Sequence, residues 1–497
     1  MLSSLTRRAA RSYATLKPAP FGQPRPESHP HLLKEGEMTG GIQSAEYAAR
    51  RARLVDALPD DSIVVAAAAP INYRYRQNSN FWYLTGWAEH NAAIIIQKSA
   101  SSSRGYKLSA FVAPKDENEE LWDGARTGLD AAAGLLGADE VYDYKRFVPE
   151  LQRVLNTSAA VTYVESEGNR TTSAGVPHYV QRTRDPDPWL LEFFTSPRTP
   201  RRRDLKRELA KLRTVKSPAE QEVMRAAAEI TARAHTKTMC YAKPGLGEAQ
   251  LEAHFAYLCA RDGAQRPAYV PVVASGANAL AIHYVANNAL LESGEMVLMD
   301  AGCEYNGYAS DLSASSVVCR VLCYYHSEPS YFPARTFPVN GTFTSPQADL
   351  YAAVLSVQKA SIPLCTADAG YNAHDLYFHA CRLLHAELTR LGFDLKEREV
   401  ERVLCPHGVS HSVGIDLHEP HFDSSEKLKE GMVITVEPGV YIPPLPRYPK
   451  HFYGLGIRIE DEVLVQKDHS VVLTSSAPKE IVDVEGACQD VLRLGAM

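Results

Sequence analysis

Short apolar runs separated by helical stretches mark the first globular part of the chain, which begins near Tyr47. The runs are Val64–Ala69, Ala92–Ile96 and Phe111–Ala113, and the stretch Ala45–Ala57 has helical character. Short strands mixed with helices over roughly 150 residues predict an α/β domain. Few His, Asp or Glu residues here have the spacing of ligands, so we interpret this domain as a non-catalytic module.

A second domain is predicted to begin near Asp204, because 497 residues are too many for one compact core. A loop rich in Pro and Arg, ending in Arg201–Arg203, precedes that point. Beyond it, Ser217 can cap a helix, Pro218 suits the first helical position, and Glu220 completes a capping box. Apolar residues then recur at helical spacing.

The stretch from Met296 to Asp311 (MVLMDAGCEYNGYASD) predicts a β-hairpin. Met296–Met299 is a buried strand, and Asn306-Gly307 is a strong signal for a two-residue turn. With that turn, residue 302 faces Asp311, and Asp300 lies two residues along on the same side. Both carboxylates then project from one face, with backbones roughly 7 Å apart. Two such anions repel unless a cation lies between them. Taken alone, the pair is more typical of a solvated face.

Three later segments favour a metal site instead. His407–Glu419 (HGVSHSVGIDLHE) concentrates three histidines, and Met432–Glu437 (MVITVE) is a buried strand that ends in a carboxylate. Gly456–Val465 (GIRIEDEVLV) alternates, which places Arg458 and Glu460 on one side. A glutamate that closes an apolar strand is rarely buried without a partner.

Four acids and one histidine therefore form a set of hard ligands: Asp300, Asp311, His411, Glu437 and Glu460. Oxygen-rich sites with one imidazole suit Mn²⁺, and also Co²⁺ or Zn²⁺. Four carboxylates exceed the need of one divalent ion and suffice for two. A single zinc site is disfavoured, because neither a cysteine nor a second histidine has tetrahedral ligand spacing. The alternative is a set of unconnected surface acids and core histidines.

These segments resemble the signature blocks of the aminopeptidase P family, in the same order. YVPVVASGANALAIHY, which ends at Tyr284, is similar to the upstream histidine block of that family, and YRQNSNFWYLTGW and ELWDGARTG are similar to its N-terminal domain. The resemblance implies an α/β, creatinase-like N-terminal domain over 38–204. An α+β pita-bread catalytic domain is implied over 205–497.

The resemblance also implies a role for each site residue. Asp300 would hold one metal ion, His411 and Glu437 the other, and Asp311 and Glu460 would bridge them. Glu437 would also accept a proton from the attacking water and pass it to the leaving amine. His283 and His418 would contact the scissile carbonyl, and Arg458 would fix a carboxylate ligand. His407 is left open between lining the site and structural packing.

Residues 1–37 are predicted to be a mitochondrial transit peptide and linker. No acid precedes Glu27, while Arg7, Arg8 and Arg11 lie opposite an apolar face on a helical wheel. The alternative is a disordered basic tail. This start places the chain in the mitochondrial branch of the family, with the matrix as its expected compartment.

The composition argues against a nucleic-acid-binding protein and against a membrane-spanning one. The net charge of −6 gives no nucleic-acid signature, and no apolar run is long enough to span a membrane. Nine scattered cysteines indicate reduced thiols. The expected partner is a peptide or protein N-terminus, and a homo-oligomer is left open.

The expected activity is removal of an N-terminal residue from peptides, or from imported mitochondrial proteins after presequence cleavage. The alternatives are a strict Xaa-Pro aminopeptidase, a prolidase, and a non-catalytic peptide-binding protein. The bacterial family pattern usually has an aromatic residue after the ligand histidine, where this chain has Ser412. We hypothesise that this change alters a pocket wall and weakens proline specificity.

Ser313–Ala334 departs from the family pattern. Relatives usually run D-[IL]-T-R-T-F-P-V-N-G, and here Asp311-Leu312 and Arg335–Gly341 match the two ends. One threonine is replaced by the 22 residues 313–334. This insertion would fall in mid-strand beside a metal ligand, where pairing tolerates it least. A translated intron explains the segment better than an extra metal site built from Cys319, Cys323 and His326.

Overall fold

The computed structural model describes residues 22–69, 75–157, 161–165, 202–311, 335–419 and 423–490. The chain divides into two compact units, Met1–Arg203 and Asp204–Met497. Each unit has a hydrophobic core of its own.

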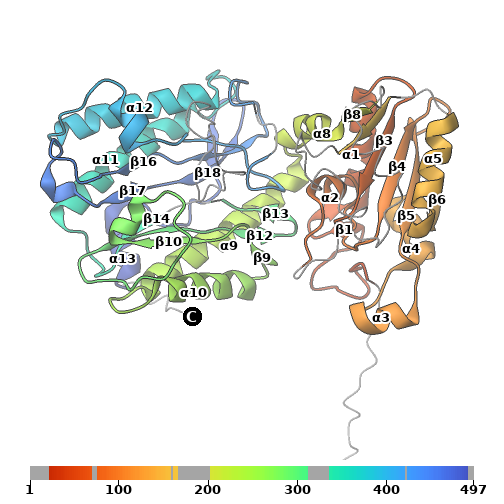
Figure 1. The fold of residues 1–497 in the computed structure, drawn as a ribbon, viewed down its shortest axis with the longest axis horizontal. Helices are drawn as coiled ribbons and strands as arrows, with labels where there is room; N and C mark the ends of the chain where they lie inside the picture. The colour runs from red at the N-terminus through yellow and green to blue at the C-terminus, as the bar shows by residue number, and fades with distance from the viewer. Residues whose placement is uncertain are drawn as a thin grey trace, which may run out of the picture. The chain divides into compact units, whose positions relative to one another are not determined.

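Unit 1 is built on a six-stranded sheet with strand order β6-β5-β4-β3-β7-β8, and helices lie on both sides of it (Figure 1). The apolar run predicted at Ala92–Ile96 covers the first four residues of β4 (Ala93–Lys98), which pairs antiparallel with β3 and β5. Ile95 and Val65 face helix α5, while Ile94 and Ile96 are also fully buried. A strand buried on both faces explains the unbroken apolar run. The predicted α/β class of this unit is confirmed.

The elements of unit 1, including the edge strand at its boundary, are β1 (Glu37–Thr39), β2 (Ile42–Gln43), α1 (Ser44–Ala57), β3 (Ile63–Ala67), α2 (Ser79–Thr85), β4 (Ala93–Lys98), β5 (Tyr106–Val112), α3 (Glu117–Asp123), α4 (Gly128–Leu136), β6 (Glu140–Asp143), α5 (Phe147–Thr157), β7 (Thr162–Val164) and β8 (Arg202–Asp204).

The transit peptide and linker over residues 1–37 stay a prediction, but the described part of that stretch packs within unit 1. Gln23 is only 2% exposed. Its backbone N–H donates to Thr127 Oγ1 at 2.8 Å, and its side chain donates to the Gly86 carbonyl at 3.0 Å. Leu33 is also buried. Prolines suggested a linker, but buried hydrogen bonds to distant residues make this stretch part of unit 1. Residues 1–21 lie outside the described residues.

Unit 2 is an α+β unit in which short sheets lie between two sets of helices. In Figure 1, α11 and α12 lie above the strands and α9, α10 and α13 lie below them. The sheets are β10-β11-β14, β13-β12-β9, β15-β18-β19 and β16-β17. The predicted capping box is confirmed, because Ser217 and Glu220 exchange hydrogen bonds at the start of α9 with Pro218 in the first turn. The implied pita-bread class is also confirmed.

The elements of unit 2 are α8 (Leu205–Thr214), α9 (Pro218–Tyr241), α10 (Glu248–Arg261), β9 (Arg266–Pro267), β10 (Val272–Ser275), β11 (Met296–Asp300), β12 (Cys303–Tyr305), β13 (Tyr308–Ala309), β14 (Arg335–Pro338), α11 (Ser345–Ser361), α12 (Ala373–Arg390), a π-helical turn (Val400–Leu404), β15 (Val433–Val436), β16 (Gly439–Tyr441), β17 (Gly456–Arg458), β18 (Asp461–Val465), β19 (Ser470–Val472) and α13 (Ile481–Cys488).

The predicted register around the turn is confirmed, but the stretch Met296–Asp311 is not one hairpin. The first arm breaks after Asp300, because β11 pairs with β10 and β14 whereas β12 pairs with β13 and β9, so Asp300 belongs to a different sheet from the hairpin. Glu304 pairs with Ala309 and Tyr305 with Tyr308, so the turn is Asn306-Gly307. Both turn residues have positive φ, 49° and 80°, as a type I′ turn requires. Asp311 therefore follows directly from the returning strand.

The stretch Gly456–Val465 differs from the single alternating strand that the sequence predicts. It forms two strands, β17 and β18, which belong to different sheets. Ile459 and Glu460 lie between them. The break lets Glu460 leave the ladder and turn its carboxylate toward the other acids.

Of the helices in the described part of the chain, none combines the length and the apolar character needed to cross a membrane.

Candidate metal centre

The five predicted ligands lie at strand ends and loop starts of unit 2. Asp300 ends β11, Glu437 follows β15, and Glu460 lies between β17 and β18. Asp311 follows the hairpin, and His411 begins the segment 411–419. Ligand atoms of Asp311, His411 and Glu460 all lie within 4.8 Å of one another. Asp300 is still paired with Val272 in its sheet, so the ligands come from several different sheets whose strands end near one another.

The backbone of β15 positions His411. The His411 N–H donates to Thr435 Oγ1 at 3.0 Å, and the Thr435 N–H donates back to the His411 carbonyl at 2.9 Å. The imidazole Nε2 then lies 3.1 Å from Asp311 Oδ2 and 3.8 Å from Glu437 Oε1. Thr435 Oγ1 also donates to Glu437 Oε1 at 3.1 Å, so one threonine orients two candidate ligands.

Arg458 links Asp300 to two further side chains. Its Nη2 donates to Asp300 Oδ2, and its Nη1 donates to the Tyr441 hydroxyl at 2.5 Å. That hydroxyl lies 3.0 Å from His407 Nε2, while His407 Nδ1 lies 2.7 Å from the Gly408 carbonyl. Burial, and then the charge of Arg458, lower the pKa of His407 to about 3. His407 is therefore a neutral part of a buried chain of hydrogen bonds that supports Arg458.

The carboxylates fit a bound cation. Glu437 Oε2 and both Glu460 oxygens are buried and meet no hydrogen-bond donor among the described residues. Burial raises the pKa of Glu460 well above its usual range, and the charges of Glu437, Asp311 and Asp300 raise it further. Burial likewise raises the pKa of Asp300, against the opposing effect of Arg458. Buried anions at this density are stable only with a positive partner.

His418 and His283 lie near this cluster but are less buried. The rings of His418 and His411 pack edge to face, with centroids 4.3 Å apart. Partial burial, and then the charges of Arg458 and His418, lower the pKa of His283 to about 4. A neutral imidazole that remains open to solvent can meet a substrate carbonyl as a hydrogen-bond donor.

The structure adds three residues that the sequence did not single out. Tyr441 accepts a hydrogen bond from Arg458. Tyr269 lies beside the acids, and burial, followed by the negative charges of Asp300, Asp311 and Glu460, raises its pKa. Glu462 accepts from Ser310 Oγ at 2.7 Å and from the Asp311 N–H. Glu462 lies two positions from Glu460 in an alternating stretch, a signal that could have found it. Tyr269 has no such local signal.

Ser412 does not act as the pocket wall that its sequence position suggested. Its side chain is fully buried, and its hydroxyl accepts from Lys216 Nζ at 3.1 Å and donates to the Val433 carbonyl at 3.4 Å. The Ser412 side chain therefore lies in the protein interior, between Lys216 and β15. Its effect on proline specificity stays a prediction.

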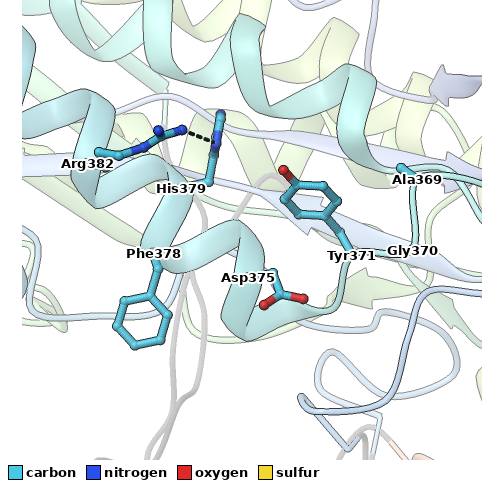
Figure 2. A pocket seen from close by; sticks show the side chains of 7 residues that line it. All are labelled: Ala369, Gly370, Tyr371, Asp375, Phe378, His379 and Arg382. Atoms are coloured by element: carbon cyan, nitrogen blue, oxygen red, sulfur yellow. Dashed lines mark hydrogen bonds between the residues drawn. The ribbon is translucent and has the colours of Figure 1, made fainter.

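A separate hollow of about 410 Å³ lies along the first turns of α12. Figure 2 shows its lining, with Phe378, His379 and Arg382 on the helix and Tyr371 just before it. Arg382 Nη2 lies 3.2 Å from His379 Nδ1. None of the five candidate ligands lines this hollow.

Comparison with known proteins matches both units. Residues 47–163 match "Aminopeptidase P, N-terminal domain", and residues 222–321 and 315–467 match "Metallopeptidase family M24". The second match falls into two pieces that meet within the segment 313–334.

Similar relatives cover the chain almost completely. Intermediate cleaving peptidase 55 of Schizosaccharomyces pombe is 35% identical over 95% of this chain and 93% of its own length. Xaa-Pro aminopeptidase 3 of Mus musculus is 36% identical over 98% and 95%. The crystal structure of Icp55 from Saccharomyces cerevisiae superposes with a TM-score of 0.78 at 33% identity, covering 92% of this chain and 100% of that one. The chain therefore belongs to metallopeptidase family M24 and, with its aminopeptidase P N-terminal domain, is a metalloaminopeptidase.

Proposed function

We propose that this enzyme removes single N-terminal residues from proteins of the mitochondrial matrix after their presequences have been cleaved. The observation that carries the proposal is the buried cluster of four acids around His411, in which Glu437 Oε2 and both Glu460 oxygens meet no hydrogen-bond donor among the described residues. The basic, acid-free start of the chain supports the compartment. The name of the S. pombe relative, intermediate cleaving peptidase 55, supports the substrate class.

Two divalent ions, with Mn²⁺ as the best fit, would be held by these five residues. Asp300 would hold one ion, His411 and Glu437 the other, and Asp311 and Glu460 would bridge them. When bound, the ions would lower the pKa of a water between them and polarise the scissile carbonyl. One imidazole among four carboxylates favours Mn²⁺ over metals that prefer nitrogen or sulfur.

The other groups of the site would orient the peptide and move its protons. Glu437, fixed by Thr435 Oγ1, would accept the proton of the attacking water and hand it to the leaving amine. His418, in contact with the ring of His411, and His283 would donate hydrogen bonds to the oxygen that becomes negative. Arg458 would hold Asp300 in place through the Tyr441–His407 chain.

A strict Xaa-Pro aminopeptidase is the second candidate, favoured by the name of the M. musculus relative. A prolidase, which cleaves dipeptides only, is the third.

Cleavage of matched peptides distinguishes these functions. We expect the Mn²⁺-loaded enzyme to release Tyr, Leu or Phe from peptides of three or more residues whether or not proline is second. Release confined to peptides with proline second would identify an Xaa-Pro aminopeptidase, and release confined to dipeptides a prolidase. N-acetylated versions of the same peptides are the control, because an aminopeptidase needs the free amine.

A further inference from the structure

A buried ionic cluster lies behind the segment His411–Glu419, which supplies both His411 and His418. Arg213 and Lys216 are each 2% exposed, and Glu419 is 4% exposed. Charged side chains are seldom buried this deeply without a partner, and burying them costs free energy. None of the three is among the candidate ligands, so their burial needs another explanation.

Arg213 holds the segment through two acids. Its Nη2 donates to Asp416 Oδ2 at 2.6 Å, and its Nε lies 2.9 Å from Glu419 Oε2. Asp416 and Glu419 lie on either side of His418. One guanidinium from the last turn of α8 therefore binds the segment at two points.

Lys216 holds the other end of the segment. Its Nζ donates to Ser412 Oγ at 3.1 Å, directly after His411 in the chain. The Lys216 N–H donates to the Gly431 carbonyl at 2.8 Å, and Val215 forms a bridge with Met432, just before β15. Lys216 is thereby fixed to the strand that leads to Glu437.

Gly414 shows how closely these groups pack. A Cβ at this position would lie 2.2 Å from Glu419 Oε1 and 3.2 Å from Lys216 Cε, so only glycine leaves room for both side chains. The Gly414 carbonyl also accepts from the Ala309 N–H at 2.8 Å. The segment is thus bonded to the hairpin that ends in Asp311.

We propose that Arg213 and Lys216 are positioning residues that fix the segment His411–Glu419 and so preorganise His411 and His418 at the metal centre. The inference rests on the proposed metal site, and it assigns a role to residues that precede the part of the chain matched to family M24. Groups that orient metal ligands typically change metal affinity about 10- to 100-fold when removed. A role confined to general stability would lower the melting temperature without loosening this segment selectively.

Lys216→Met tests the proposal, because methionine keeps the apolar stem and removes the charge and the hydrogen bond. Hydrogen exchange is measured on the metal-free protein, and Mn²⁺ affinity by titration. We expect amides of Val413–Glu419 to exchange at least fivefold faster, and Mn²⁺ to bind about tenfold more weakly. Lys216→Arg should restore most of both properties.

Arg447→Met is the matched control, because it breaks a pair with the buried Glu399 elsewhere in unit 2. It should change neither measurement. If Lys216→Met does not fold, Ser412→Ala removes the same hydrogen bond from the segment side, and Asp416→Asn weakens the ion pair of the segment with Arg213. Exchange and Mn²⁺ affinity within twofold of wild type in the folded variants would overturn the inference. Failure of the wild type to bind Mn²⁺ would instead contradict the proposed metal site.

Discussion

Glu437 combines three physical properties at one position. It is fully buried, its Oε1 accepts from Thr435 Oγ1 at 3.1 Å, and its Oε2 meets no donor among the described residues. Burial raises the pKa of Glu437 well above its usual range, although the charge of Arg458 opposes the shift. A carboxylate with one oxygen oriented by Thr435 and the other without a protein donor suits a group that would hold a cation and move a proton.

Glu437→Gln should therefore reduce turnover by about 10²- to 10⁴-fold, the usual contribution of a general base. The amide keeps the size of the side chain but can neither accept the proton nor carry the charge that a cation needs. Turnover is measured on a peptide with tyrosine first, together with bound metal by elemental analysis.

Glu399→Gln is the control, since Glu399 is also buried in unit 2 but binds Arg447 and the Lys396 N–H instead. Activity of Glu437→Gln within tenfold of wild type, with its metal content intact, would show that the assigned role is wrong.

At the scale of elements, the described residues that flank the segment 313–334 contact neighbouring residues of one strand, β18. The Asp311 N–H donates to Glu462, and Arg335 Nη2 binds Asp461 Oδ1 at 2.8 Å. Arg335 also begins β14, paired with Met299 of β11. Both flanking residues are therefore held in the β-structure around the metal centre, where the family pattern has only two residues between Asp311 and Arg335.

We predict that mature transcripts lack 63 nucleotides here, which would restore D-L-T-R-T-F-P-V-N-G by replacing 22 residues with one threonine. If Ser313 is AGT and Pro333-Ala334 is CCA-GCA, an intron from GT to AG joins A to CA and encodes that threonine. Sequencing the transcript across the Asp311 codon is the measurement. Messages that all retain the 63 nucleotides would rule the prediction out.

At the scale of the whole molecule, unit 1 limits how much of the N-terminus can be removed. Gln23 is buried and binds Thr127, Gly86 and the Ala88 N–H, so a start downstream of it would break these bonds. A cut before residue 22 leaves every described contact in place. We therefore predict that the removable part lies within residues 1–21.

We predict that the mature protein begins at Ala14. Arg11-Ser12-Tyr13-Ala14 places an aromatic residue two positions after an arginine and before a small residue. A first cut after Ser12 would expose Tyr13, which this enzyme would then remove from itself. N-terminal sequencing of the mitochondrial protein is the measurement. A start at Tyr13 would contradict self-processing, and a start beyond Gln23 would contradict the limit set by unit 1.

The sequence by itself determined whatever depends on neighbouring residues. Asn306-Gly307 defined the hairpin register, and Ser217 with Glu220 defined the start of α9, because turns and caps are local interactions. The sequence also suggested five candidate ligands, of which the structure brings atoms of Asp311, His411 and Glu460 within 4.8 Å of one another. Apolar runs, which are also local signals, predicted β3, β4 and β5 of unit 1, but not the other strands of its sheet.

Only the tertiary structure decided which distant groups meet. Lys216 binds Ser412, which lies 196 residues away, and Arg458 connects Asp300 to Tyr441. The break between β17 and β18 at Glu460 and the burial of Gln23 also depend on contacts between residues far apart in the sequence. These contacts depend on how packed elements bring side chains together across the fold, and local periodicity carries no information about that.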